Sequence, residues 1–441
     1  MISSRKFDRR FFQLYIASFP FLNALSPTTW LPLPTLIAFL SLLYYAIDGR
    51  LWRYFRLEED DLLLAAVFLL GAIGIITHIY FAGQSNLNHI IWYLLTFMLP
   101  LAWVRGWLTL ARMTPSQIGV GAMMGLLIAS GAVITECITS NFFGFYLNEV
   151  IPYASPPEDM INANTLEDLW RPRGLAAEPG FTAMVMEALG PLSWLYLRDH
   201  RRLAWIVAPI GGLGFLLCAS AGGWMCIILA ATVLTLLRGR VGKGVIFLLV
   251  LVVVFIVSIS ISTDAYWVYQ QVLGNKLENL LWGSSADVPT SGTQRDIIYS
   301  FAADTVRNYP FGLGWGMVAQ MFNTGNHFAN LPATYGRGMV SLYLEIIVCA
   351  GIPGLALFII FIFRKLTVLF RMTRSPDTTV ILFSFLALLF HHSIVLEFWY
   401  PMLWFMIAMT SYLFKTQASM QPSGIFYPSN AAVGPSSRGH E

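Results

Sequence analysis

Two polar stretches of this chain carry arginines whose positions suit the binding of an anion. Arg171 and Arg173 stand just before one apolar segment, and Arg295 and Arg307 lie within an amphipathic one. The guanidinium group is a planar fork that binds carboxylate or phosphate oxygens in pairs. We therefore expect the two stretches to contribute to one binding site for an anionic group.

The first stretch, WRPRGLAAEPGFTAMVMEALG, covers residues 170–190. Pro179 favours the first turn of a helix, where its missing N–H costs nothing. The free N–H groups and the positive dipole end of that helix would then lie close to Arg171 and Arg173 and help them hold an anion. In the alternative reading the arginines bind lipid headgroups or pair with nearby carboxylates: Glu167, Asp168 or Glu178.

The second stretch, residues 290–316, reads as an amphipathic helix. Thr293 and Asp296 resemble a capping box at its start, which places Arg295 in the first turn and Arg307 in the last. A cation near a helix N-terminus opposes the macrodipole, so Arg295 is the stronger functional candidate. The alternative is a helix lying on a bilayer surface with solvated charges.

Pro310 should end this helix, and Gly312, Gly314 and Gly316 follow it. A glycine run that binds a nucleotide phosphate follows a strand and opens a helix, which this one does not. We interpret it as a tight, closely packed turn.

Ionisable residues inside apolar segments are further candidates, because their burial in a membrane is costly. Glu345 is the best placed of them, near the start of an apolar run that directly follows the second polar region. A structural hydrogen bond is the competing role for its carboxylate. The others are Glu187, His391, His392 and Glu397.

The composition indicates an all-α polytopic membrane protein. Of the 441 residues, 56% are hydrophobic and only 12% are charged, and the net charge is +3. The four cysteines lie inside apolar runs and are expected to pack there. With no Asp-x-Asp, His-x-x-x-His or Cys-x-x-Cys in the sequence, we expect no metal, no cofactor and no nucleic-acid partner.

The positive-inside rule gives the topology. Of the 27 Lys and Arg residues, 21 fall in segments that alternate as cytoplasmic, and six fall in two long loops on the other face. About twelve helices, each near the roughly 20 residues needed to span a bilayer, then leave both termini in the cytoplasm. They are expected near 11–26, 31–47, 62–82, 87–104, 118–139, 179–197, 203–219, 221–237, 245–263, 341–363, 379–397 and 399–415.

This gives six regions along the chain. They are helices one to five (1–139), an outer loop (140–178), helices six to nine (179–263), a large outer loop with the amphipathic helix (264–340), helices ten to twelve (341–415) and a disordered cytoplasmic tail (416–441).

Three segments in order resemble one family. RPRGLAAEPGFTA is similar to the R-x-x-G-x-x-x-E-P signature of bacterial polysaccharide polymerases, and RDIIYS followed by NYPFGLGWG resembles a region shared by O-antigen polymerases and ligases. SLYLEIIVCAGIPGLALFI, residues 341–359, is similar to the segment that follows in the family. The resemblance covers the chain from about residue 170 to residue 363.

The resemblance implies a metal-independent glycosyltransferase of the bacterial inner membrane. Its substrate would be an oligosaccharide on undecaprenyl pyrophosphate, and a flippase and a chain-length regulator would be its partners. Arg173 or Arg171, together with Arg295, then correspond to the pyrophosphate-binding residues, with Arg337 added from the same loop. The base that deprotonates the acceptor is left open among three residues: Glu345, Glu178 and His327.

Two alternatives remain beside polymerisation into O-antigen or exopolysaccharide. Ligases of the family carry a His-Asn pair just before the Leu-Glu helix, where this chain has Met339-Val340-Ser341, so we favour a polymerase. A transporter or flippase would also have twelve spans, but it should have short loops and paired charges near the membrane midplane.

Overall fold

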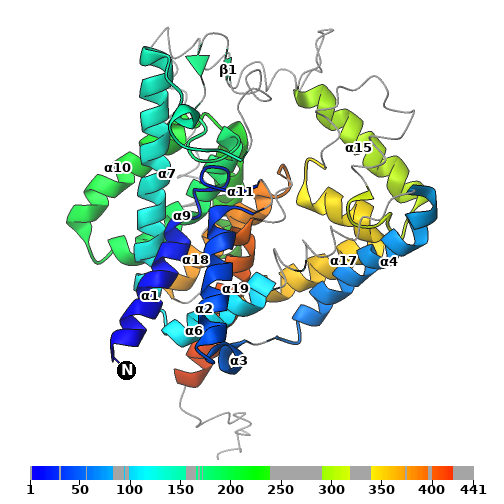
Figure 1. The fold of residues 1–441 in the computed structure, drawn as a ribbon, viewed down its shortest axis with the longest axis horizontal. Helices are drawn as coiled ribbons and strands as arrows, with labels where there is room; N and C mark the ends of the chain where they lie inside the picture. Colours follow the sequence, from blue (N-terminus) through cyan, green and yellow to red (C-terminus); the bar gives the residue numbers. More distant parts are fainter. Residues whose placement is uncertain are drawn as a thin grey trace, which may run out of the picture.

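In the computed structural model the chain is mostly helical (Figure 1). Within the described residues, the strands are β1 (Thr165–Leu166) and β2 (Leu169–Trp170), a short antiparallel pair. The expected helical fold is therefore confirmed for that part of the chain. The structure describes residues 2–28, 31–55, 57–82, 94, 99–154, 165–166, 169–170, 172–238, 291–317, 339–372, 375–395 and 400–420.

Two of the helices begin and end at the residues expected from the sequence, α9 (Pro179–Leu197) and α11 (Ala221–Leu237). The others are α1 (Ile2–Ala17), α2 (Leu33–Ile47), α3 (Leu51–Tyr54), α4 (Asp61–Ala82), α6 (Leu99–Ala111), α7 (Pro115–Phe143), α10 (Arg201–Leu217), α15 (Ser291–Asn308), α17 (Leu342–Arg371), α18 (Pro376–His391) and α19 (Pro401–Met420), with a 3-10 turn, η2, at Leu147–Glu149.

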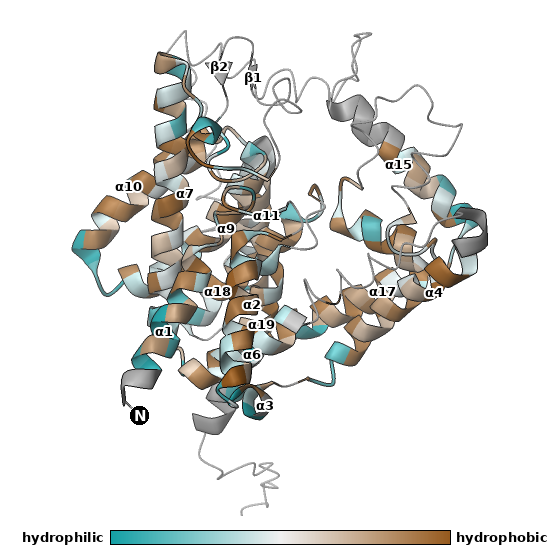
Figure 2. Ribbon diagram, in the orientation of Figure 1, coloured by the Kyte–Doolittle hydropathy of each residue, from teal (hydrophilic) through white to brown (hydrophobic). Residues whose placement is uncertain are grey.

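The helix surfaces have the character of a membrane domain. Among the described residues, α7 and α17 are long and apolar enough to cross a bilayer, and four shorter apolar segments lie in α2, α4, α11 and α18. Large apolar side chains face outward, among them Ile47 at 89% and Trp205 at 82% exposure. Figure 2 shows apolar residues over most of the helices. Exposed apolar surface on this scale suits contact with lipid.

The first helix lies nearer the N-terminus than the expected 11–26. It ends at Ala17, because Pro20 disfavours helical backbone at Phe19, and the Ser18 hydroxyl donates to the Tyr15 carbonyl (2.7 Å). The residues that follow form a turn segment, in which the N–H groups of Asn23 and Ala24 donate to the Leu175 carbonyl (3.1 and 3.0 Å). This segment therefore supports the outer polar loop.

The fourth expected span, 87–104, is also placed differently. Most of it lies outside the described residues, and α6 continues to Ala111 through what was expected to be a cytoplasmic loop. Its Arg105 is buried and binds both carboxylate oxygens of Asp61, at 2.7 and 3.0 Å. A charge paired in this way can lie inside a helix packed against its neighbours.

Several C-terminal helices extend beyond their expected ends on the predicted cytoplasmic side. α17 runs to Arg371 and not to 363, and α19 runs to Met420, into the expected tail; residues 421–441 lie outside the described part. α18 starts early, at Pro376, because the Ser375 hydroxyl caps it by accepting from Asp377 N (3.2 Å).

A carboxylate before α4 joins these extended ends. Glu58 accepts from Lys365 Nζ (3.0 Å) and from the Ser411 hydroxyl (2.7 Å), and it pairs with Lys415 Nζ (3.0 Å). Burial by itself would raise the pKa of Glu58, but Arg105 and Lys365 outweigh it and lower the pKa to about 2. The glutamate therefore stays ionised and links α4, α17 and α19 at neutral pH.

The helices pack as a bundle with a helical pair beside it (Figure 1). α7 packs against α1, α9 and α10, and α18 packs against α9 and α11. α4 lies along α17, and α15 packs against α17 as well. The first polar loop is thus attached to the bundle, and the amphipathic helix to the α4–α17 pair.

The glycine run after α15 is a closely packed turn, as expected. Gly312, Gly314 and Gly316 all have positive φ, and Leu313 N and Gly314 N donate to the carbonyls of Val348 and Cys349 (both 2.9 Å). These carbonyls are available because α17 breaks at Gly351, whose φ is 73° and ψ −176°. The turn fills the break and satisfies backbone groups that a bilayer interior would leave unpaired.

We predict that Gly314→Ala destabilises the protein strongly. A Cβ at this position would lie 2.3 Å from Ile75 N, and the residue has a φ of 107°. Crowding and backbone strain of this kind cost on the order of 1–3 kcal/mol each. The measurement is the unfolding temperature of the purified protein in detergent. The control is Gly131→Ala, a helical position with nothing within 4 Å of the added Cβ, which should unfold no earlier than wild type. Equal unfolding temperatures for the two variants would contradict the prediction.

Candidate functional site

A buried carboxylate on α7 holds the outer polar loop in place. Glu136 Oε2 accepts from the backbone N–H groups of Arg173 (2.8 Å) and Gly174 (2.6 Å), and the side chain is fully buried. Gly174 has a φ of 61°, which favours glycine at this position. Two charge-assisted hydrogen bonds from adjacent residues therefore fix the course of the loop against the bundle.

The loop holds the Arg173 side chain inside the protein. Its guanidinium carbon lies 4.6 Å from the centre of the Tyr153 ring, and Nε lies 3.9 Å from Glu136 Oε1. Within the described part of the chain, Nε, Nη1 and Nη2 make no hydrogen bond. Burial lowers the pKa of the Arg173 guanidinium, although Glu136 and Tyr153 act in the opposite direction. Arg173 is thus a buried cation whose hydrogen-bond donors are unused.

The start of α9 completes this cluster, which we call the Arg173 site: Glu136, Tyr153, Arg173, Gly174 and Thr182. The Thr182 hydroxyl donates to the Arg173 carbonyl, and the Tyr153 hydroxyl donates to the Gly174 carbonyl (2.6 Å). α9 has Pro179 in its first turn, as expected, and no side-chain cap. The Arg173 backbone is therefore tied to the first turns of α9, while its guanidinium lies over the Tyr153 ring, and a guanidinium is chemistry suited to phosphate.

Glu136 did not enter the sequence prediction. The alternative there paired Arg173 with Glu167, Asp168 or Glu178, whereas the described partner is a carboxylate 37 positions earlier in the chain. Glu167 and Asp168 lie outside the described residues. A lone acidic residue in an apolar run, as in ITECITS, was the available signal, because intramembrane charges are functional candidates.

The candidate bases occupy different surroundings. Glu178 is the exposed N-cap residue of α9, close to the Arg173 site. Glu345 lies in the first turn of α17, where it is buried, and its Oε1 accepts from the Cys349 thiol (3.4 Å). This contact of Glu345 is therefore within α17. His327 lies outside the described residues.

The second polar stretch forms α15, but the helix begins at Ser291, before the expected cap at Thr293. Arg295 is therefore one turn inside the helix and not in its first turn, and its side chain is outside the described part. Arg307 is in the last turn as expected, 81% exposed, with Nη1 3.8 Å from Asp304 Oδ1. Two further candidates, Arg171 and Arg337, lie outside the described residues.

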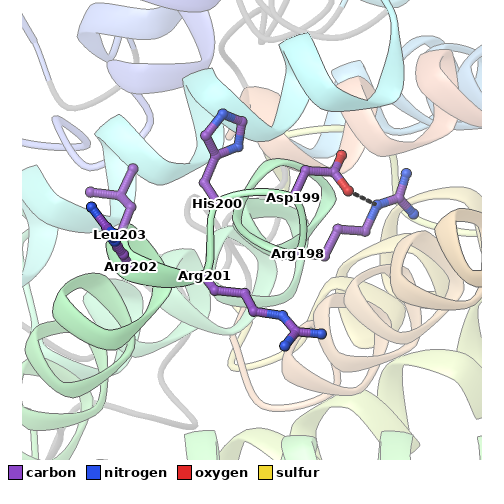
Figure 3. A pocket seen from close by; sticks show the side chains of 6 residues that line it. All are labelled: Arg198, Asp199, His200, Arg201, Arg202 and Leu203. Atoms are coloured by element: carbon purple, nitrogen blue, oxygen red, sulfur yellow. Dashed lines mark ion pairs between the residues drawn. The ribbon is translucent and has the colours of Figure 1, made fainter.

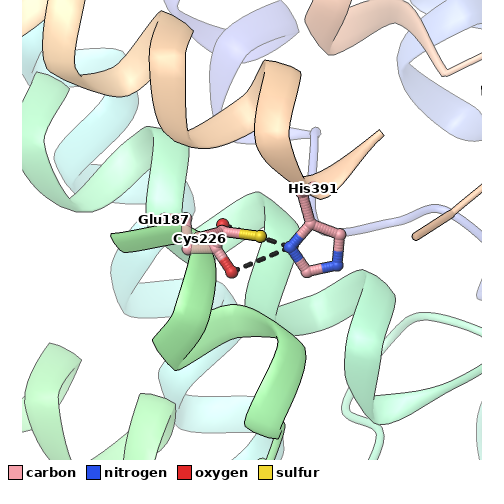
Figure 4. Close-up of side chains that lie close together, drawn as sticks. All are labelled: Glu187, Cys226 and His391. Carbon is pink, nitrogen blue, oxygen red and sulfur yellow. Dashed lines mark hydrogen bonds and ion pairs between the residues drawn. The ribbon is translucent and has the colours of Figure 1, made fainter. Parts of the chain in front are cut away.

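Two of the intramembrane candidates form a pair. His391 Nδ1 lies 2.9 and 3.1 Å from the two carboxylate oxygens of Glu187, and both side chains are buried (Figure 4). Their neighbour His392 is also buried, and its carbonyl accepts from Leu342 N (3.0 Å) at the start of α17. Glu397 lies outside the described residues. The sequence identified these residues singly, and the fold brings Glu187 and His391 together.

A basic pocket of about 470 Å³ is formed by residues 198–203, between α9 and α10 (Figure 3). Arg198 binds Asp377 at the start of α18, whereas Arg201 and Arg202 are exposed. This segment is one of the expected cytoplasmic loops, at the opposite end of α9 from the Arg173 site. Its charges are those that the positive-inside rule requires.

Comparison with protein families gives one match. Residues 186–359 match the family model described as O-Antigen ligase. This part of the chain, less than half of its length, is similar to the O-antigen ligase family. The match contains two of the three resembling segments, with Arg295, the glycine turn and Glu345, while Arg173 and Glu136 lie N-terminal to it. A search of curated proteins found no match to the chain.

The match to the O-antigen ligase family indicates the chemistry in outline. Its members are membrane proteins that act on lipid-linked glycans and have ligase-like or polymerase-like glycan-transferring activity. A lipid-linked oligosaccharide is accordingly the class of substrate that fits this chain. An arginine whose backbone is held by α7 and α9 is a suitable group to bind the anionic part of such a substrate.

We predict that Glu136 and Arg173 are energetically coupled. Glu136→Gln leaves Arg173 as a buried charge beside a neutral amide, and Arg173→Gln leaves the carboxylate without its cation, so each should cost on the order of 1–3 kcal/mol. The double variant should lose less free energy of unfolding than the two single variants lose together, by about 1 kcal/mol or more. Unfolding of the purified proteins in detergent measures this cycle. Glu149→Gln, at an exposed position in η2, is the control, and strictly additive losses would show that the pair is not coupled.

Proposed function

We propose that the protein polymerises oligosaccharide repeat units carried on undecaprenyl pyrophosphate, forming O-antigen or exopolysaccharide at the periplasmic face of the bacterial inner membrane. The observation that carries the proposal is Arg173, a buried cation whose guanidinium makes no hydrogen bond in the described part of the chain. Its loop is predicted to face the periplasm. The match to the O-antigen ligase family supplies the class of substrate.

In the proposed reaction a hydroxyl of the acceptor glycan attacks the anomeric carbon of the donor sugar. The new glycosidic C–O bond forms as the bond from that carbon to the pyrophosphate oxygen breaks. Arg173 and Arg295 bind the leaving pyrophosphate, and Arg171 and Arg337 are further candidates. Preorganised donors in a partly dry site contribute on the order of a few kcal/mol to such a step. Because arginines neutralise the pyrophosphate, the transfer would need no added Mg²⁺.

The acceptor proton would pass to a carboxylate or imidazole: Glu178, Glu345 or His327. Of the two described residues, Glu178 is the better placed. It is exposed and begins the helix whose Thr182 contacts Arg173, whereas Glu345 is buried beside Cys349. We therefore propose Glu178 as the first base to test.

The residues before α17 favour a polymerase over a ligase. Where ligases resemble one another in a His-Asn pair, this chain has Met339-Val340-Ser341. Met339 is buried, and the Ser341 hydroxyl donates to the His392 carbonyl (3.3 Å). These positions therefore serve packing and offer no imidazole for transfer to another acceptor.

A transporter or flippase is the second candidate function, and one observation favours it. Glu187 and His391 form a buried pair between helices, which is the arrangement expected of proton-coupled transport. The outer polar loops and the Arg173 site favour the enzyme. Experiments on chain length distinguish the two, because a defective flippase leaves repeat units on the cytoplasmic face.

We predict that Arg173→Lys and Arg295→Lys each stop polymer formation while the protein stays folded and inserted. Lysine keeps the charge but cannot bind two oxygens with a planar fork. Arg307→Lys is the control, because its exposed cation at the end of α15 merely complements the helix dipole. The measurement is the length distribution of lipid-linked and finished glycan in cells.

Single repeat units should accumulate on the outer face in the two inactive variants. Normal-length polymer from both would show that the pyrophosphate assignment is wrong. Full-length chains stranded on the lipid carrier would favour a ligase, and repeat units held on the cytoplasmic face would favour a flippase.

We also predict that loops 140–178 and 264–340 face the periplasm. Cysteines introduced at Ser155 and Ser285, both outside the described residues, should react with an impermeant thiol reagent in cells whose outer membrane alone is permeabilised. Asp199→Cys in the expected cytoplasmic loop should react only after lysis. The unsubstituted protein, with its four native cysteines, measures the background labelling. Labelling of Ser155→Cys or Ser285→Cys only after lysis would reverse the topology.

A further inference from the structure

Three side chains with metal-binding atoms meet between α9, α11 and α18. Their ligand atoms, a Glu187 carboxylate oxygen, Cys226 Sγ and a His391 ring nitrogen, all lie within 4.8 Å of one another. The exposed fractions are 1%, 3% and 1% respectively. Figure 4 shows the three side chains pointing toward a common centre from separate helices. Because the residues are far apart in the chain, their spacing in the sequence does not identify the cluster.

A glycine lets α11 approach the carboxylate closely. Gly223 is on the same helix as Cys226, and a Cβ there would lie 2.8 Å from Glu187 Oε1. Both oxygens of Glu187 face His391 Nδ1, at 2.9 and 3.1 Å. These separations suit either a proton shared between the two side chains or two ligands of one small cation.

The set of donor atoms selects the cation. A thiolate, an imidazole nitrogen and a carboxylate oxygen are the ligands of zinc, whereas magnesium and calcium take oxygen ligands almost exclusively. We propose that Glu187, Cys226 and His391 form a zinc site, with a fourth position open to water. The site is independent of the pyrophosphate chemistry proposed above, which arginines carry out.

Zinc would offset the cost of burying these polar groups. A carboxylate, a thiol and an imidazole lie among apolar helices, where polar groups are expensive unless they are paired or bound to a metal. The metal would also join three helices. His391 ends α18, and the next residue, His392, accepts from Leu342 N and the Ser341 hydroxyl, so the site adjoins the start of α17. The proposed role is therefore structural.

The test uses the full-length protein, purified in detergent without chelator. After incubation with zinc and removal of the excess, elemental analysis should find about one zinc per chain. Cobalt put in place of zinc should give the absorption band of a cobalt–thiolate bond. Cys226→Ser should remove that band, and His391→Gln and Glu187→Gln should reduce the bound zinc.

Cys218→Ser and His200→Gln are matched controls, since Cys218 is a buried cysteine and His200 an exposed histidine outside the cluster. Both should bind zinc as wild type does. Zinc should also raise the unfolding temperature of wild type and Cys218→Ser but not of Cys226→Ser, because only a ligand of the native state stabilises it. This comparison holds even if Cys226→Ser is itself less stable.

Two results would overturn the proposal. One is a zinc content of the wild-type protein that stays at the background level after incubation, which would mean that Glu187 and His391 share a proton instead. The other is a cobalt–thiolate band that survives Cys226→Ser, which would place the metal at another cysteine.

Discussion

The two hydrogen bonds that Glu136 accepts are the constraint on which the candidate site depends. They hold the backbone of Arg173 and Gly174 against α7, and the same carboxylate lies 3.9 Å from Nε of the buried Arg173 guanidinium. A buried arginine is costly without such a partner. The anion site proposed here is therefore a property of α7 as much as of the loop that carries Arg173.

The remaining polar groups follow the same rule at both ends of the bundle. On the predicted cytoplasmic side, Glu58 contacts Lys365, Lys415 and the Ser411 hydroxyl. These contacts join the start of α4 to the C-terminal parts of α17 and α19. In the α4–α17 pair, the N–H groups of Leu313 and Gly314 satisfy carbonyls that the break at Gly351 releases. In both places the polar groups are thus paired by a segment distant in sequence.

This arrangement is consistent with the similarity of residues 186–359 to the O-antigen ligase family. The family match covers α15, the glycine turn and most of α17, which form a unit packed on α4. The Arg173 site lies on the other part of the molecule, on α7 and α9. A lipid-linked substrate that contacts both arginine stretches would accordingly contact both parts of the molecule.

The sequence alone determined the helical class of the described residues, the limits of α9 and α11 and the turn at Gly312–Gly316. These follow from local chemistry: apolar runs, a proline at a helix start and glycines at positive φ. The expected ends of α1, α6 and α17 were wrong. Pro20 ends α1 before a turn that binds the Leu175 carbonyl, whereas distant partners, Asp61 for Arg105 and Glu58 for Lys365, hold charged residues inside the longer α6 and α17. Only the tertiary structure could join Glu136 to Arg173 or Glu187 to Cys226 and His391. Such pairings depend on how the helices pack, and the spacing of residues in a single sequence does not specify which helices come together.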